Sequence, residues 1–180
     1  MLSKHISWKL FAYFAAGSLI GALIGGQLVI NLPIEILRSI LALFILYSAW
    51  MPQKWSLPSN ALVLTIGGAT TTFLTMFVGA TGPFVMALLR SFKLDRLTLV
   101  ASGAALLVLQ HLLKVIVFMS LGFIFEPYLS LMVLMVCAGL VGTMIGKSVL
   151  LKINEQRFQL ALKVLLSALA LRLLWQVAIA

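Results

Sequence analysis

The sequence predicts an all-α fold, a polytopic bundle of transmembrane helices. Of its 180 residues, 63% are hydrophobic and only 9% are charged, and the mean hydropathy is +1.17. Because soluble domains carry about 25% charged residues, this chain has too little polar surface to enclose an apolar core in water. The apolar residues also fall into about six stretches, each near the ~20 residues that a bilayer-crossing helix needs. Lipid is therefore the solvent that suits the chain.

The six predicted spans are separated by short connections that contain proline or charged residues. The first span is expected to be permanent rather than a signal peptide, because no small-residue cleavage site before a polar region follows it. Four tryptophans fall at span ends, where amphipathic rings anchor helices at the membrane interface. The spans run near 10–31, 34–51, 60–90, 97–124, 128–150 and 158–179.

Basic residues gather in the connections and give a formal net charge of +9. A soluble protein with that charge would suggest nucleic acid as a partner, but no basic and aromatic surface accompanies it here. Control of membrane orientation is the simpler interpretation. We expect a multi-pass protein of the cell (inner) membrane, with the loops near 32–38, 90–96 and 151–157 cytoplasmic and both termini outside.

The predicted spans lack the arrangements of residues that most enzymes use. Cys137 is the only cysteine, so neither an internal disulfide nor a zinc cluster is expected. All four acidic residues lie near span ends, so no pair of carboxylates can act within the membrane. A phosphate-binding P-loop is absent as well. We therefore expect no enzyme activity, no cofactor and no metal.

Two parts of the chain resemble each other. Residues 17–50 match 138–171 at a constant offset, which pairs Gly21 with Gly142 and Gly25 with Gly146. Glycines four apart recur by chance in membrane helices, but the shared order of helix, hinge and helix favours duplication. We predict one transmembrane domain, 1–180, in which 1–59 is the remnant of a first repeat and 60–180 is a second. Its first hairpin would be missing, through a truncated reading frame or in a short form completed by homodimerisation.

The third span is predicted to be broken. As one straight helix, 60–90 would be about 46 Å long, against a hydrocarbon core of ~30 Å. Because a new helix would start at the break, its unpaired N–H groups would attract an anion; the alternative is a kinked helix whose glycines only assist packing. The candidate substrate-binding residues here are Thr72, Thr75, Gly79, Ala80, Thr81, Gly82 and Pro83.

The fourth span carries polar residues at bilayer depth. Gly103, Leu107, Gln110 and Lys114 share one helical stripe, and His111 flanks it. A charge this deep costs at least about 2.5 kcal/mol on the insertion scale, and no acidic residue lies mid-span to pair with Lys114. We predict that Gln110 and Lys114 bind an anionic substrate and that His111 carries a proton. The alternatives are a snorkelling lysine and a histidine bonded to a backbone carbonyl.

These motifs resemble the TauE/SafE family of sulfite and organosulfonate exporters. The similarity rests on Gly68-Ala69 through Phe77-Val78-Gly79-Ala80-Thr81-Gly82-Pro83, on the following helix with Gln110 and Lys114, and on the closing Gly142-x3-Gly146. The resemblance implies gradient-driven export of small anions such as sulfite, thiosulfate or an organosulfonate.

The sequence thus supports two functional hypotheses. The first is an anion transporter that uses alternating access, with the lipid bilayer, a small anionic substrate and a second copy of the chain as partners. The other is a non-transporting structural or assembly subunit of a larger membrane complex.

Overall fold

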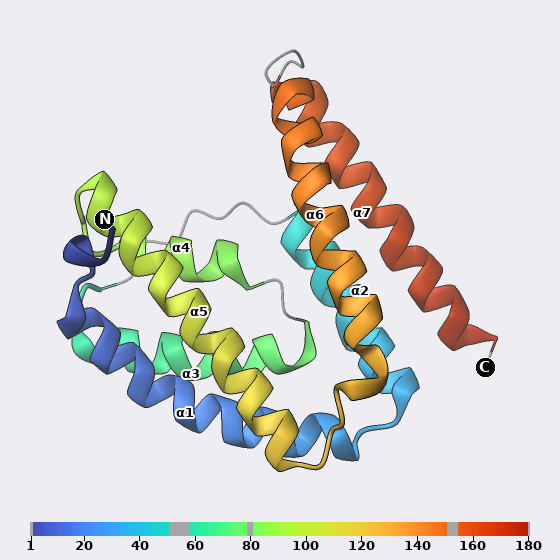
Figure 1. Cartoon of the computed structure of the whole chain (residues 1–180), viewed down its shortest axis with the longest axis horizontal. Coiled ribbons are helices and arrows are strands. Elements are labelled where there is room, and N and C mark those ends of the chain that lie inside the picture. The colour runs from blue at the N-terminus through green and yellow to red at the C-terminus, as the bar shows by residue number, and fades with distance from the viewer. Residues whose placement is uncertain (1, 51–57, 79–80, 151–154, 180) are drawn as a thin grey trace.

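The computed structural model describes residues 2–50, 58–78, 81–150 and 155–179, and all secondary structure in this part of the chain is helical (Figure 1). The all-α prediction is confirmed, and the predicted break in the third span is present between α3 and α4. The helices are α1 (Trp8–Asn31), α2 (Ile34–Trp50), α3 (Ala61–Phe77), α4 (Gly82–Arg90), α5 (Arg96–Ser120), α6 (Leu129–Leu150) and α7 (Glu155–Ala178), with short 3-10 turns η1 (Leu2–His5) and η2 (Glu126–Tyr128).

Polar caps fix where α3 and α5 begin. The Asn60 side chain accepts a 2.8 Å hydrogen bond from the Val63 N–H. The Asp95 carboxylate accepts 3.1 Å bonds from the N–H groups of Leu97 and Thr98. In each case the cap satisfies donors that have no partner within the first turn of a helix.

A glycine ends α5 through a Schellman motif. Gly122 adopts φ = +87°, which an L side chain rarely tolerates. Its N–H donates to the Met119 carbonyl at 3.1 Å, and the Phe123 N–H donates to the Phe118 carbonyl at 2.9 Å. The rings of Phe118 and Phe123 also meet, 6.2 Å apart. These contacts turn the chain away from α5 towards η2.

Three long helices, α1, α3 and α5, form the packed core and run in the same direction. A Cβ added to Gly17 would overlap the carbonyl oxygen of Thr65, and one added to Gly21 would overlap that of Ala69. The contacts therefore advance together along α1 and α3, backbone against backbone. Such close approach is how helices associate in lipid, where no hydrophobic force drives them together.

The short helix α4 runs back along α3. Leu88, near its end, fills the space beside Gly67, whereas Gly82, at its start, lies beside Leu107 in the middle of α5. Phe92, which follows α4, lines a cavity together with Lys9 at the start of α1. α3 and α4 are therefore the two arms of a helical hairpin that enters and leaves at one end of the core (Figure 1).

This hairpin corrects the expected arrangement of the loops. The sequence predicts one crossing over 60–90, so that the loops near 32–38 and 90–96 share a face. In the structure, residues 91–95 lie with the start of α1, and residues 32–33 follow its far end, near the last turns of α5, where Gly26 meets Val117. A break stops a helix but does not fix the direction in which the next one leaves, and here packing against α3 and α5 reverses it.

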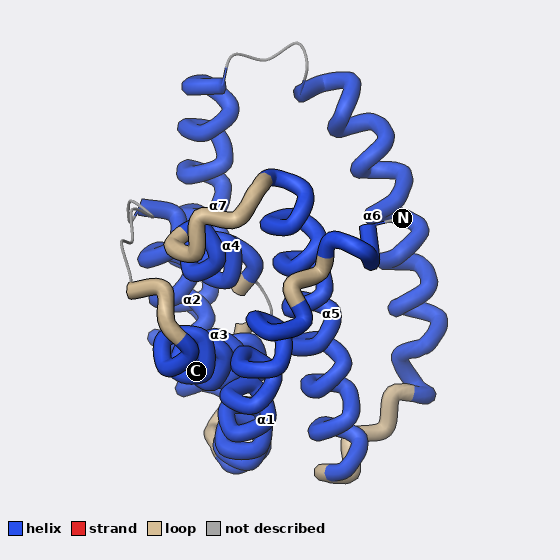
Figure 2. Tube along the Cα trace, turned by 90° about the vertical axis from the view of Figure 1, so that its left-hand side faces the viewer, coloured by secondary structure: helices blue, strands red, loops and turns tan. Residues whose placement is uncertain are grey.

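The remaining helices, α2, α6 and α7, are not part of this core. α2 packs against α7, where the indole N–H of Trp50 donates to the Ser167 hydroxyl at 3.0 Å. α6 diverges from α7 in Figure 2, and its membrane-length segment buries no residue. The helices whose described residues are long and apolar enough to cross a membrane are α1, α5 and 126–145, and α3 is a shorter apolar helix. The division into repeats at residue 59 stays a prediction.

Candidate functional site

A buried polar network lies at the tip of the hairpin, against the middle of α5. Its members are side chains that would each be costly to bury alone, since an unpaired hydroxyl or amide in an apolar medium costs several kcal/mol by transfer to alkane. They come from α1, α3, α5 and the turn between α3 and α4, so segments far apart in sequence converge here. The network consists of Ser18, Thr71, Thr72, Thr75, Thr81 and Gln110, all buried.

Gln110 is the centre of this network. Its amide nitrogen donates to the hydroxyls of Thr71 and Thr72, at 2.9 Å each. Thr72 in turn donates to the Ser18 hydroxyl at 2.9 Å, which connects α3 to α1. On its other side, the Gln110 amide oxygen accepts a longer bond of 3.4 Å from Thr81. A single side chain therefore holds both arms of the hairpin.

The hydroxyls of Thr75 and Thr81 meet across the break at 2.5 Å. Thr75 also donates to the Thr71 carbonyl at 2.8 Å. A hydroxyl carries one hydrogen, and these two hydroxyls take part in three contacts that each need one: Thr71, Gln110 and the contact between them. Two hydrogens therefore serve three contacts, and one of these contacts is always without its hydrogen.

The Lys114 ammonium turns inward to the same place. It donates a 2.8 Å hydrogen bond to the Thr75 carbonyl, in the last turn of α3, and lies 5.6 Å from the centre of the Phe118 ring. Its side chain is half-buried, so the snorkelling alternative does not describe it. Cations near the carbonyl end of a helix are favoured, because that end carries a partial negative charge.

The predicted stripe on α5 is confirmed as a continuous contact surface. From one end to the other it meets α4 at Gly103 and Leu107 and α3 at Gln110 and Lys114. His111 lies outside this surface: its side chain is exposed and bonds to no other described residue. Its predicted role in proton coupling therefore has no contact with the network to support it.

Two of the other predicted site residues begin the second arm of the hairpin. Gly82 and Pro83 open α4, where proline suits the first turn because its missing N–H has no partner to lose. The N–H groups of Phe84 and Val85 donate to the Thr81 carbonyl, at 3.0 Å and 3.2 Å. Gly79 and Ala80 were also predicted to bind substrate, and they lie outside the described residues.

Two members of the network are missing from the predicted site. Thr71 lies one helical turn before Thr75, and this spacing already puts the two side chains on one face. Ser18 stands beside Gly17, on the glycine-rich face of α1 that packs against α3. The threonine run gave a signal for Thr71, whereas only the pairing of α1 with α3 identifies Ser18.

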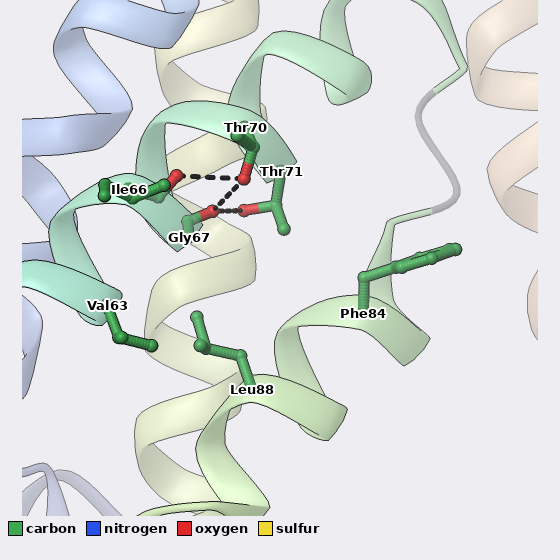
Figure 3. A pocket seen from close by; sticks show the side chains of 7 residues that line it. All are labelled: Val63, Ile66, Gly67, Thr70, Thr71, Phe84 and Leu88. Carbon is green, nitrogen blue, oxygen red and sulfur yellow. Dashed lines mark hydrogen bonds between the residues drawn. The ribbon is translucent and has the colours of Figure 1, made fainter. Parts of the chain in front are cut away.

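An apolar cavity of about 250 Å³ lies between the arms of the hairpin (Figure 3). Thr70 and Thr71 point towards it but donate their hydroxyl hydrogens back to carbonyls of their own helix, Thr71 to Gly67 at 2.5 Å. Thr71 thus connects the cavity wall to the buried network. The residues that line the cavity are Val63, Ile66, Gly67, Thr70, Thr71, Phe84 and Leu88.

The comparison with known protein families decides where this chain belongs. The family described as Sulfite exporter TauE/SafE matches residues 2–173. The chain belongs to the TauE/SafE family. No curated protein and no solved structure matches it. The matched region includes the whole hairpin, α5 and the polar network, so in this TauE/SafE protein the site lies within the part that defines the family. Membership also makes it a membrane protein of a transporter family, as expected.

Proposed function

We propose that this TauE/SafE protein exports small anions of the sulfite, thiosulfate or organosulfonate type by gradient-driven alternating access. The observation that supports this most is the meeting of a helical break, a cluster of buried hydroxyls and an ammonium group in the packed core. Non-helical backbone inside a membrane is tolerated only where it is buried in protein or lines a cavity. Broken helices of this kind hold the substrate sites of many transporters.

The charge balance at the network favours an anion. The ammonium of Lys114 has three N–H donors, and one of them is used on Thr75. The described residues of α1, α3, α4 and α5 contain no carboxylate side chain. An entering oxyanion would therefore find a cation without a carboxylate partner on these helices, next to hydroxyls and the amide of Gln110 that can reorient towards it.

Alternating access needs one part of a protein to move against another, and the contacts of α1, α3 and α5 are compatible with such a movement. The backbone contacts between α1 and α3 are too close to slide. The tip of the hairpin, by contrast, is held to α5 by polar contacts that can be remade when a substrate enters. Rocking of the tip against α5 would open the network first to one side and then to the other.

Flux of [³⁵S]thiosulfate into proteoliposomes tests this proposal. Wild-type protein should move the anion, and Lys114→Met should abolish most of this movement. Lys163→Met is the matched control, because it removes the same charge from α7, where the ammonium lies over the Trp50 ring, 5.4 Å from its centre. Equal flux in wild type and Lys114→Met would refute the role of Lys114, and no flux in wild type would refute transport by this chain alone.

A structural role in a larger complex is the second candidate. Its support is α6, whose apolar side chains between residues 129 and 145 are all exposed. Wild-type protein that moves no thiosulfate alone but does so with a co-purified membrane partner would favour this function over independent transport.

A further inference from the structure

The position of the Lys114 ammonium resembles that of a bound cation. The last four carbonyl groups of a helix have no partner within it and carry its partial negative charge. The Thr75 carbonyl lies in the last turn of α3, where it accepts from the N–H of the capping residue Val78 and, at 2.8 Å, from the Lys114 ammonium. Lys114 therefore places a positive charge where the first arm of the hairpin ends.

Other oxygen atoms of the same buried network are of the kind that a monovalent cation binds. The Thr75 and Thr81 hydroxyls contact each other, and the amide oxygen of Gln110 accepts from Thr81. Because this group is one hydrogen short, an oxygen there always has a lone pair to offer. Hard cations such as sodium bind oxygen ligands of this kind, and in transporters the carbonyl ends of broken helices hold the coupling ion.

We propose that the end of α3 is the coupling-cation site of this transporter and that Lys114 occupies it as a tethered cation. This inference rests on the proposed function, and it makes the proton the coupling ion instead of sodium. The protonated amine holds the hairpin tip through Thr75. Loss of its proton to water on one side leaves a neutral amine, which frees the tip to move. Uptake of a proton from water on the other side restores the bond.

Other charged and titratable groups on the elements around Lys114 face elsewhere. α3 has none. On α1 and α4 the candidates are Lys9, Tyr13 and Arg90, which lie at the end of the core where the hairpin enters. On α5, Arg96 lies at that same end, and His111 is exposed. Glu126 follows α5 in the turn η2, where its side chain is exposed.

Flux through wild-type protein gives the first test. Thiosulfate is the probe because it is the anion of a strong acid and does not change its charge near neutral pH, so that a pH effect reports on the protein and not on the anion. An imposed pH gradient should drive flux, and replacing sodium by N-methylglucamine on both sides should leave the rate unchanged. A strict requirement for sodium in wild type would overturn the inference.

Removal of the tethered cation gives the second test. Lys114→Ala should leave an open cation site, so its melting temperature in detergent should rise with sodium or ethylammonium but not with N-methylglucamine. Wild type and the control Lys163→Ala should show no such preference. The melting temperature can be measured without any transport. If sodium or ethylammonium raised the melting temperature of Lys114→Ala but wild-type protein moved no thiosulfate, the proposed function would be refuted and the cation site would stand. Wild-type flux with no cation preference in Lys114→Ala would overturn the site and keep the function.

Lys114→Arg covers the case in which the alanine variant does not fold. Arginine keeps the positive charge at Thr75 but does not lose its proton in proteins. The variant should fold and bind, and its flux should no longer respond to a pH gradient. A wild-type response to the gradient in Lys114→Arg would overturn the inference.

Discussion

A Cβ atom on Gly21 would overlap the carbonyl oxygen of Ala69, so α1 and α3 touch through their backbones at this point. Gly21→Ala should therefore push the two helices apart. Overpacking of a core costs about 1–3 kcal/mol, and a collision with backbone belongs near the upper end of that range, because no side chain can rotate away. The measurement is the melting temperature of the purified protein in detergent.

Gly142→Ala is the matched control, because Gly142 is the residue that the internal repeat aligns with Gly21. A Cβ there would meet nothing within 4 Å. Its effect should stay within about 0.5 kcal/mol, as for ordinary surface substitutions. A loss at Gly142 as large as that at Gly21 would contradict the packing described for α6.

Gln110→Leu should destabilise the hairpin and reduce anion flux together. The change removes two donated bonds of 2.9 Å and leaves the hydroxyl oxygens of Thr71 and Thr72 without that donor. A buried polar group that loses its partner costs about 1–3 kcal/mol, although side-chain bonds in membranes average nearer ~0.6 kcal/mol. A loss of about 1 kcal/mol is therefore expected, measured by unfolding in detergent, with flux assayed on the same preparation.

Gln27→Leu serves as its control, since the Gln27 side chain is exposed on α1. Stability and flux should both stay close to wild type. If the two leucine variants lost stability equally, loss of a polar residue in general, and not of the network, would explain the Gln110 result.

Helical periodicity was enough to predict which face of α5 carries the site. Gly103, Leu107, Gln110 and Lys114 follow one another at intervals of three and four residues, and the structure places all four against the hairpin. The break at Gly82 and Pro83 was equally visible, because glycine and proline interrupt helices for local reasons.

The direction of α4 could not be predicted in the same way. It depends on Leu88 fitting beside Gly67 and on Gly82 lying beside Leu107, which are contacts between segments far apart in sequence. The exposure of the His111 side chain could not be predicted from the sequence either. It is one residue from Gln110, and only the neighbouring helices decide that one side chain is buried and the other exposed.

Asp95 should make the stability of α5 depend on pH. Hydrogen bonds from Thr98, first from its side chain and then from its backbone, lower the pKa of this exposed carboxyl. A group whose pKa is lower in the folded state stabilises the fold at all pH values above its unfolded pKa, near 3.9. That contribution is lost as the pH falls through the folded value.

The comparison of wild type with Asp95→Asn measures this effect, because asparagine also caps a helix but does not titrate. Wild type should be the more stable at about pH 6, and the difference should shrink below about pH 4. Glu126→Gln is the control, since it removes a carboxylate outside α5. A difference between wild type and Asp95→Asn that is constant with pH would show that the cap does not depend on its charge.

Trp50 should join α2 to α7 through two separate contacts. Its indole N–H donates to Ser167 at 3.0 Å, and its ring lies 5.4 Å from the Lys163 ammonium. Trp50→Phe keeps a ring for the cation but loses the N–H, whereas Trp50→Ala loses both contacts. Trp50→Ala should therefore lower the melting temperature more than Trp50→Phe. Trp175→Phe should change it little, because the Trp175 indole is about as exposed as that of Trp50 but makes no such contact with another described side chain.

A double-mutant cycle of Trp50→Phe with Ser167→Ala isolates the hydrogen bond. Its coupling energy should be near the ~0.6 kcal/mol average for side-chain bonds between membrane helices. A cycle of Trp50→Ala with Lys163→Met should give a coupling of about 0.5–1 kcal/mol, the range for an exposed cation over a ring. If both cycles gave zero, α2 and α7 would not be paired through Trp50. α2 and α7, which the predicted repeat would make equivalent, would then have to be paired by their aliphatic side chains alone.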